Sequence, residues 1–427
     1  MKIFSTLYKC TSWLIPLKTT RTKYKNYLTS LDLKQNLIKV KNNYKRVIEK
    51  LKNKTEKIKV IFLIRENQKW TYQSVYEEFE KSNKFEPLVL VSLLNLAAKG
   101  KDKTRNNLQE TYDFFKSRGM NVDYAYKNGK YIDLEEFKPD IVFYDQEWDL
   151  PEIHMPEYVS NFALTFYSLY GSTVFEYPDL YTQKFHRFLF RYFVENELNI
   201  DIYSSQIKEN KENCVVVGYP KLDEYFKADE TCNLWKQPDK LKIIYAPHHS
   251  LEQNGMRLAT FKQNYKFILE LAKKYPQTTW MFKPHPRLKY AILRTKLMNE
   301  DEADKYWKEW AEIGAVYEKG NYINLFKTSD LMITDCDSFL VEYIPSKKPL
   351  IRLVNEQAIN LNELGRKITQ SFYSVYNNDE LESIFEKLVV KNQDEKLESR
   401  KALIKGIMNT QETVAKKIHD SVLEVIK

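Results

Sequence analysis

Three short segments in the second half of the chain gather side chains that can act on phosphate groups. They are residues 248–250 (His-His-Ser), 283–287 (Lys-Pro-His-Pro-Arg) and 335–338 (Asp-Cys-Asp-Ser). A lysine, an arginine and a protonated or hydrogen-donating histidine stabilise negative charge on a diphosphate. The prolines on both sides of His285 restrict the backbone that aims its imidazole. Together the three segments predict a site for a nucleotide diphosphate.

Each residue of this candidate site has an expected task and a plainer alternative. We expect His285 to be catalytic, Ser338 to begin a helix whose backbone N–H groups hold phosphate, and Glu342 to accept hydrogen bonds from ribose hydroxyls. The plainer alternatives are a loop histidine without a task at position 285 and simple helix capping by Asp335 and Ser338. The expected substrate-binding residues are His248, His249, Lys283, Arg287, Thr334, Asp335, Asp337, Ser338 and Glu342.

Apolar runs of strand length precede the three segments, and a matching series occupies the first half of the chain. Runs without strict alternation, separated by helix-like stretches, are typical of parallel strands covered on both faces. The expected strands are 58–65, 87–94, 140–146, 161–169, 241–247, 278–284, 330–335 and 348–354, and the expected helices include 71–83, 103–118, 259–275, 339–346 and 378–391. The pattern predicts an α/β protein of two Rossmann-like domains, with ligands beyond the carboxyl ends of the strands.

The division between the domains is expected in the polar stretch 219–240, which contains Pro220 and Pro238. Domain boundaries favour such exposed, proline-containing segments. We therefore predict a basic helical arm over 1–56, an N-terminal Rossmann-like acceptor domain over 57–225 and a C-terminal Rossmann-like nucleotide-donor domain over 226–427. The charged helical stretch 395–427 is expected to pack back across the join.

The net charge of +9 is concentrated near the N-terminus. Residues 1–60 carry 16 Lys and Arg against three acidic residues, a balance of +13, so the remaining 367 residues sum to −4. Apolar side chains recur at three- and four-residue steps over 2–18 and again from Leu33 to Leu51, which predicts amphipathic helices. The first helix suits either an anionic membrane surface or packing on the body. The second is expected to pack against the domain that follows.

Composition excludes several classes of protein. A length of 427 residues predicts two or three domains, and 43% hydrophobic residues exclude global disorder. None of the 10 glycines builds a Gly-rich phosphate loop, and no uninterrupted apolar run of about 18 residues predicts a membrane-spanning helix. The four cysteines lack C-x-x-C spacing, which argues against zinc sites and disulfide scaffolds and fits a reducing cytoplasm. No metal or other cofactor is expected.

The second half also resembles a known family. GYPKLDEY (218–225), YAPHHS (245–250), KPHPRLK (283–289) and SDLMITDCDSFLVEY (329–343) are similar, in order and spacing, to motifs of the CDP-glycerol glycerophosphotransferases. That family comprises teichoic-acid primases and polymerases with a GT-B architecture, in which two Rossmann-like domains face a cleft. Basic N-terminal segments that associate with the cytoplasmic face of the membrane are common in it. The resemblance extends from residue 218 to residue 354.

Two positions depart from the family pattern. The family places a His-Gly pair in its first half, where the histidine is the proposed base for the acceptor hydroxyl. The comparable stretch here, SLYGS (168–172), has Tyr170 in place of that histidine. The residues expected to replace the base are His154 and Asp145, and the same stretch, YDQEWDLPEIH (144–154), also offers Glu147 and Asp149. Asp337 stands where the family has a serine, which puts a carboxylate where the diphosphate should bind.

The resemblance implies a transferase that moves a polyol phosphate, glycerol phosphate first among them, from a CDP-linked donor to a hydroxyl of a lipid-linked or polymeric glycan. The expected setting is teichoic-acid or capsule biosynthesis on the cytoplasmic face of the cell membrane, with residues 1–56 on the anionic surface. A GT-B glycosyltransferase that uses a nucleotide sugar is the alternative, because fold does not fix function. A nucleic-acid binder is disfavoured by the slightly acidic body, so nucleic acid is not an expected partner.

Overall fold

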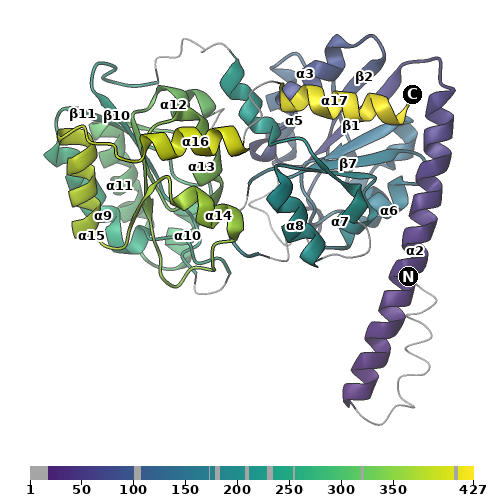
Figure 1. The fold of residues 1–427 in the computed structure, drawn as a ribbon, viewed down its shortest axis with the longest axis horizontal. Helices are drawn as coiled ribbons and strands as arrows, with labels where there is room; N and C mark the ends of the chain where they lie inside the picture. The colour runs from purple at the N-terminus through teal and green to yellow at the C-terminus, as the bar shows by residue number, and fades with distance from the viewer. Residues whose placement is uncertain are drawn as a thin grey trace. The chain divides into compact units, whose positions relative to one another are not determined.

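The computed structural model describes nine stretches of the chain (Figure 1): residues 18–100, 107–172, 174–177, 183–206, 211–227, 234–252, 255–318, 322–407 and 412–427. All but the last residue of the helix predicted over 2–18 lies outside them. The chain forms two compact units: Met1–Tyr170, Asp179–Val217 and Lys416–Lys427 make the first, and Gly171–Pro178 and Gly218–Ala415 make the second. The functional boundaries at 56/57 and 225/226 stay predictions.

A parallel sheet of seven strands forms the centre of the first unit, in the order β3-β2-β1-β6-β7-β8-β9. The strands are β1 (Ile58–Ile64), β2 (Phe85–Val91), β3 (Val122–Tyr124), β6 (Ile141–Tyr144), β7 (Leu164–Ser168), β8 (Arg191–Val194) and β9 (Cys214–Val216). β1, β2, β6 and β7 confirm the four predicted strands, and β6 and β7 are buried along their whole length. The sequence analysis misses β3, β8 and β9, because runs of three or four residues show no period.

Helices accompany this sheet along the chain, together with one small hairpin. The helices are α2 (Lys18–Lys52), α3 (Gln73–Lys81), α4 (Asn95–Ala98), α5 (Leu108–Lys116), α6 (Pro156–Val159), α7 (Lys184–Phe188), α8 (Glu197–Gln206) and, from the end of the chain, α17 (Val414–Val425), and the hairpin is β4 (Tyr126–Lys127) with β5 (Lys130–Tyr131). The His419 ring on α17 lies 5.4 Å from the Phe79 ring and 5.3 Å from the Phe85 ring. The last residues of the chain therefore pack on the first unit.

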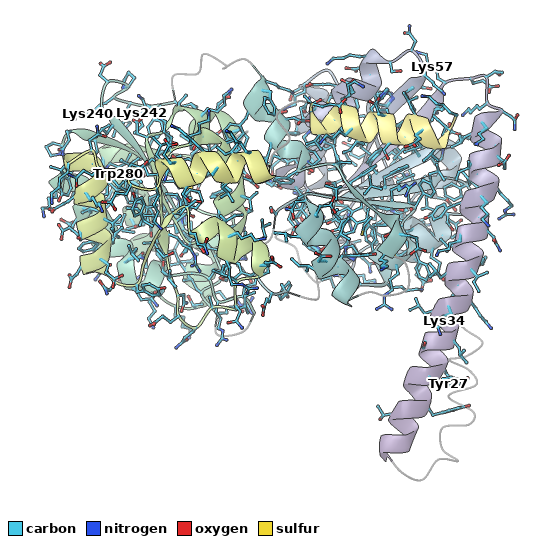
Figure 2. The ribbon with its side chains drawn as sticks, viewed as in Figure 1. Tyr27, Lys34, Lys57, Lys240, Lys242 and Trp280 are labelled. Carbon is cyan, nitrogen blue, oxygen red and sulfur yellow. The ribbon has the colours of Figure 1, made fainter. Side chains whose placement is uncertain are left out.

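The helix α2 packs on the first unit through the apolar stripe predicted between Leu33 and Leu51. Its buried residues there are Leu37, Val40, Tyr44, Val47 and Leu51. The Tyr44 hydroxyl donates to the Phe188 carbonyl at 2.6 Å and contacts the Thr165 hydroxyl. The amino-terminal part of α2 extends beyond the sheet (Figure 1), and the side chains of Tyr27 and Lys34 point outward from it (Figure 2). The predicted packing of the second helical segment is thus confirmed.

Among the described residues, we find no helix whose length and apolar character would let it cross a membrane.

A parallel sheet of six strands forms the centre of the second unit, in the order β12-β11-β10-β13-β14-β15. The strands are β10 (Leu241–Ala246), β11 (Thr278–Phe282), β12 (Ala315–Val316), β13 (Leu331–Thr334), β14 (Leu350–Leu353) and β15 (Tyr373–Val375). The helices are α9 (Phe261–Lys274), α10 (Leu288–Arg294), α11 (Glu300–Ile313), α12 (Ile323–Thr328), α13 (Asp337–Glu342), α14 (Glu363–Thr369), α15 (Asn378–Phe385) and α16 (Leu397–Ile407). The four strands predicted in this half are confirmed.

Aromatic packing fixes β11 within the second unit. Trp280, labelled in Figure 2, stacks on Phe385 of α15 with 5.8 Å between ring centroids, and Phe282 stacks on Trp310 of α11 at 5.2 Å. Gly314 follows α11 where the chain passes the Trp280 backbone, and a Cβ at this glycine would lie 2.0 Å from the Trp280 carbonyl oxygen. Only glycine fits this close approach. Large rings packed on one face of the sheet therefore hold β11, the strand that leads into Lys283 and His285.

Candidate functional site

The strand order of the second unit brings the three phosphate-directed segments to one edge. β10 lies between β11 and β13, and all three strands run parallel. Their carboxyl ends therefore meet, and each predicted segment begins directly beyond one of these ends. The Lys283 N–H donates to the Tyr245 carbonyl at 2.8 Å, and the His285 N–H donates to the Pro247 carbonyl at 3.0 Å. The two loops after β10 and β11 are thus fixed to each other by their backbones.

Three imidazoles gather at this edge. The rings of His249 and His285 stack with centroids 4.0 Å apart, His248 lies 4.4 Å from His249, and His248 lies 5.3 Å from His285. Burial lowers the pKa of His249 to about 4. Burial, followed by the charge of the neighbouring imidazoles, holds the pKa values of His248 and His285 well below the usual range. All three rings are therefore neutral near pH 7 in the absence of a bound anion.

Backbone contacts fix the tautomers of two of these rings. The Arg287 N–H donates to His285 Nδ1 at 3.1 Å, and the Ser250 N–H donates to His248 Nδ1 at 3.2 Å. A neutral imidazole whose Nδ1 accepts a hydrogen bond carries its proton on Nε2. His285 and His248 therefore present Nε2–H donors, which suit the oxygens of a phosphate group.

The same three histidines are close enough together to be compared with a metal site. Their potential ligand atoms lie within 4.8 Å of one another, whereas nitrogens about 2.0–2.1 Å from a tetrahedral zinc ion lie only about 3.3 Å apart. Each ligand nitrogen must also point at the metal within its own ring plane, and the planes of His249 and His285 are stacked at 25°. The Nε2–H tautomers and the nearby charge of Arg287 and Lys283 disfavour a cation further. The cluster fits an anion better than a metal ion.

Lys283 supplies a buried positive charge beside the cluster. Its side chain is 7% exposed, and its ammonium lies 4.4 Å from the Tyr322 ring centroid and 4.9 Å from the Phe339 centroid. Within the described part of the chain, no carboxylate lies within ion-pair distance of this ammonium. Burial lowers the pKa of Lys283 to about 8. A buried cation held only by aromatic faces is poised to bind an anion.

Glu342, the expected ribose acceptor, lies in a network that the sequence analysis did not identify. Its carboxylate accepts hydrogen bonds from the hydroxyls of Tyr219 at 3.1 Å and Tyr322 at 2.6 Å, and the Lys221 ammonium lies 3.6 Å away. Lys221 and Tyr219 belong to the segment 218–225, which resembles a family motif. That resemblance was the signal in the sequence that could have pointed to these two residues. A contact between Glu342 and ribose stays a prediction, and it would have to displace one of these donors.

Asp335 and Thr334 hold the strand ends in place. One carboxylate oxygen of Asp335 accepts the His248 N–H at 2.5 Å, and the other accepts the N–H and the hydroxyl of Thr260 at 2.6 and 2.9 Å. The Thr334 hydroxyl donates to the Ala246 carbonyl at 2.7 Å and accepts the Cys336 N–H at 3.0 Å. Both side chains are buried. In the structure both side chains position the strand ends, and their contacts with substrate stay predictions.

The beginning of α13 carries the remaining candidates of this unit. Asp337 is the first residue of this six-residue helix, and its carboxylate accepts the Ser338 N–H at 2.8 Å. Burial raises the pKa of Asp337 to about 6, so the unfavourable carboxylate noted in the sequence is partly neutralised at slightly acidic pH. Ser338 is half-buried and Arg287 is exposed at the start of α10. Contacts of Ser338, Asp337 and Arg287 with substrate stay predictions.

Asp145 and His154, the two bases expected from the first unit, both have other tasks. Asp145 forms a fully buried ion pair with Arg65 at 2.8 Å and also accepts the Arg65 backbone N–H at 2.7 Å. His154 donates from Nε2 to the Ile132 carbonyl at 2.8 Å, and burial lowers its pKa to about 4. An imidazole as weakly basic as that of His154 is a poor proton acceptor near pH 7, and the Asp145 carboxylate is occupied by Arg65. The structure therefore favours neither residue as the base.

The carboxyl edge of the first sheet presents a different set of side chains. Lys69 is paired with Glu66 at 2.7 Å and lies over the rings of Trp148 and Tyr170, 4.2 and 4.8 Å from their centroids. The Trp148 and Tyr170 rings meet edge to face at 5.3 Å. Tyr170, at the position where the family histidine is expected, is thus part of an aromatic and cationic cluster.

The comparisons with known proteins agree with this fold and with the family resemblance seen in the sequence. Residues 183–398, half of the chain, match the family model described as CDP-Glycerol:Poly(glycerophosphate) glycerophosphotransferase. All candidate residues from His248 to Glu342 lie inside the match, whereas Asp145, His154 and Tyr170 precede it. No curated protein sequence matches the chain.

Two solved structures illustrate the similarity of fold. UDP-GlcNAc 2-epimerase from Neisseria meningitidis, bound to UDP-GlcNAc, is 17% identical with a TM-score of 0.56, and the match covers 86% of this chain and 100% of that one. S. aureus MnaA in complex with UDP is 14% identical with a TM-score of 0.54, and the match covers 86% and 98% of the two chains. At such low identity the likeness shows the fold alone, which is the GT-B architecture of two Rossmann-like domains. Because the family model matches half of the sequence, this chain is an enzyme of the CDP-glycerol:poly(glycerophosphate) glycerophosphotransferase family.

Proposed function

We propose that this enzyme transfers a polyol phosphate, glycerol phosphate first among them, from a CDP-linked donor to a hydroxyl of a lipid-linked or polymeric glycan. The observation that carries the proposal is the buried ammonium of Lys283, which has no carboxylate within ion-pair distance among the described residues, together with the Nε2–H donor of His285 two residues on, at the edge where three parallel strands end. Family membership supports the reaction class. Teichoic-acid or capsule biosynthesis is the proposed setting.

The proposed reaction is an in-line displacement at the β-phosphorus of the donor. The acceptor oxygen forms a bond to this phosphorus while the bond to the bridging oxygen breaks, so that CMP leaves and carries the new negative charge. In this proposal Lys283, Arg287 and the neutral His285 ring stabilise that charge, because fixed donors act where charge develops in the transition state. The proton of the acceptor hydroxyl must go to a base.

A panel of CDP-alcohols and nucleotide sugars tests the proposal, with the released nucleotide identified by mass. Release of CMP, together with polyol phosphate on the acceptor, is the expected result. Release of a nucleoside diphosphate would overturn it and would favour the second candidate, a glycosyltransferase. That candidate has one observation in its favour, because the structural neighbours named above were solved with UDP and UDP-GlcNAc.

A pH profile tests the role of Lys283. We expect kcat/KM for the donor to fall as the pH rises through about 8, because the protonated ammonium binds phosphate and burial lowers its pKa to about 8. Lys283→Arg should abolish this alkaline limb, since a guanidinium stays charged. Lys289→Met, which changes a half-exposed lysine on α10, is the control and should keep the wild-type profile. An alkaline limb that survives in Lys283→Arg would assign it to another group.

We also propose that the basic N-terminal segment binds the anionic cytoplasmic face of the membrane. Residues 1–30 contain six Lys and Arg and no acidic residue, and each such charge contributes about 1 kcal/mol near an anionic surface. Removing the whole predicted arm, 1–56, would also remove the buried stripe from Leu37 to Leu51. A deletion that ends at residue 30 keeps this stripe.

Deletion of residues 1–30 is therefore expected to release the enzyme from anionic vesicles in a sedimentation assay while leaving its thermal midpoint close to that of the full chain. Vesicles of neutral lipid serve as the control and should bind neither protein. Equal binding of the truncated and full-length proteins to anionic vesicles would exclude this segment as the membrane contact.

A further inference from the structure

The structure leaves a carboxylate oxygen at the first sheet's carboxyl edge without a partner among the described residues. Glu147 follows β6 and is 2% exposed. Its Oε2 accepts a hydrogen bond from the Tyr167 hydroxyl at 2.6 Å, whereas its Oε1 is buried and has no hydrogen-bond partner among the described residues. A buried carboxylate oxygen that is left unsatisfied costs free energy. A buried carboxylate oxygen that no donor contacts is a candidate proton acceptor.

The loop that carries Glu147 is fixed by Arg65. The Arg65 guanidinium donates to the Trp148 carbonyl at 2.5 Å and also to the Gln146 carbonyl, on either side of Glu147. The buried ion pair with Arg65 also fixes Asp145, which lies two residues before Glu147 in the same loop. Glu147 is therefore presented by a rigid segment, as precise proton transfer requires.

We propose that Glu147, rather than a histidine, is the general base that takes the proton from the acceptor hydroxyl. This inference rests on the proposed function. The O–H bond of the acceptor breaks, its proton passes to Oε1, and the oxygen uses the freed electron pair to form the bond to the β-phosphorus as CMP leaves. Since Oε1 has almost no exposed area, binding of the acceptor must displace the side chains that cover it.

The charges around Glu147 suit this role. Burial raises the pKa of Glu147 to about 7, against the smaller lowering effects of the Tyr167 hydrogen bond and of the positive charges of Lys69 and Arg65. Tyr167 stays protonated, because burial and the Glu147 charge hold its pKa well above the usual range. A base is most effective when its pKa lies near the working pH. The weakly basic His154 does not meet that condition.

The test is the pH dependence of transfer by Glu147→Gln, which keeps the size of the side chain and an acceptor for the Tyr167 hydroxyl. Wild-type kcat/KM should fall as the pH drops through about 7, because the protonated carboxyl cannot accept the acceptor's proton. Glu147→Gln should lower kcat about 10²-fold, keep the Kd for the CDP-linked donor and lose this acid limb. Glu147→Asp should retain the limb with reduced turnover.

Glu152→Gln, which changes an exposed carboxylate five residues further on, is the matched control and should behave as wild type. A folded Glu147→Gln enzyme that keeps the wild-type acid limb would overturn this inference but not the proposed function. Loss of the acid limb in Tyr170→Phe would do the same. A changed thermal midpoint with unchanged kcat and pH profile would mean that Glu147 is structural. A wild-type enzyme that releases CMP from no donor would instead overturn the proposed function, and this inference with it.

Discussion

His285→Ala is expected to lower transfer from the CDP-linked donor roughly 10²–10³-fold, the range for the loss of one transition-state donor. The reason is the Nε2–H group, which the Arg287 N–H fixes by occupying Nδ1. The ring lies half-exposed in a loop beyond β11, so the variant should stay folded. Because burial, followed by the neighbouring charges, holds the pKa of His285 well below the usual range, the ring should contribute no alkaline limb to kcat/KM.

Steady-state kinetics and thermal unfolding of matched variants check this expectation. His285→Gln, whose amide N–H can replace the imidazole donor, should recover part of the lost turnover. Tyr290→Phe changes an exposed residue of the adjoining helix α10 and should have wild-type activity. A folded His285→Ala enzyme with near-normal turnover would remove the central residue of the mechanism. Failure of both His285 variants to fold would make the histidine structural.

Asp145→Ala is expected to lower the free energy of unfolding by about 3–5 kcal/mol, because it leaves the Arg65 guanidinium buried and unpaired. Both side chains of this ion pair are fully buried, and Arg65 makes three hydrogen bonds to the Asp145 carboxylate through its backbone and side chain. Denaturant unfolding measures the loss. The effect on the folding equilibrium is as large as the effect of His285→Ala on turnover, but it acts on stability rather than on chemistry.

The double variant Arg65→Met, Asp145→Leu tests whether Asp145 acts as a structural ion-pair partner or as a catalytic base. Removing both charges should restore much of the stability that Asp145→Ala loses, since an apolar pair of similar size can replace a buried ion pair. Glu152→Gln should change the stability by less than about 0.5 kcal/mol, as exposed substitutions usually do. An Asp145→Ala enzyme of normal stability that has lost its activity would return Asp145 to the role of base.

The sequence predicts which residues of the second unit come together at the candidate site. It does not predict the roles of several of these residues. Continuous apolar runs identify β10, β11 and β13, and parallel strands bring the residues after them to one edge, so the proximity of His248, His249 and His285 is predictable. The partners of Asp335 are not, because Thr260 is contributed by a loop 75 residues earlier in the chain. A carboxylate before a helix looks the same in the sequence whether it binds substrate or a backbone N–H.

In the first unit, too, the roles of the candidate residues cannot be predicted from the sequence. The sequence displays Asp145, Glu147 and His154 within one short stretch but gives no sign of which carboxylate is neutralised. Arg65 lies 80 residues before Asp145, and only the pairing of β1 with β6 brings them together. Burial then separates the two acids, because it leaves one paired with a guanidinium and the other with a raised pKa.

The return of residues 416–427 to the first unit has a consequence for biosynthesis. The ribosome makes this segment only after the whole second unit. Until the segment with His419 has been made, the surface around Phe79 and Phe85 on the first unit stays uncovered. Folding cannot proceed strictly from the amino terminus, as it does when successive domains are uninterrupted. A nascent chain stalled before residue 416 would expose aromatic surface that the folded enzyme covers.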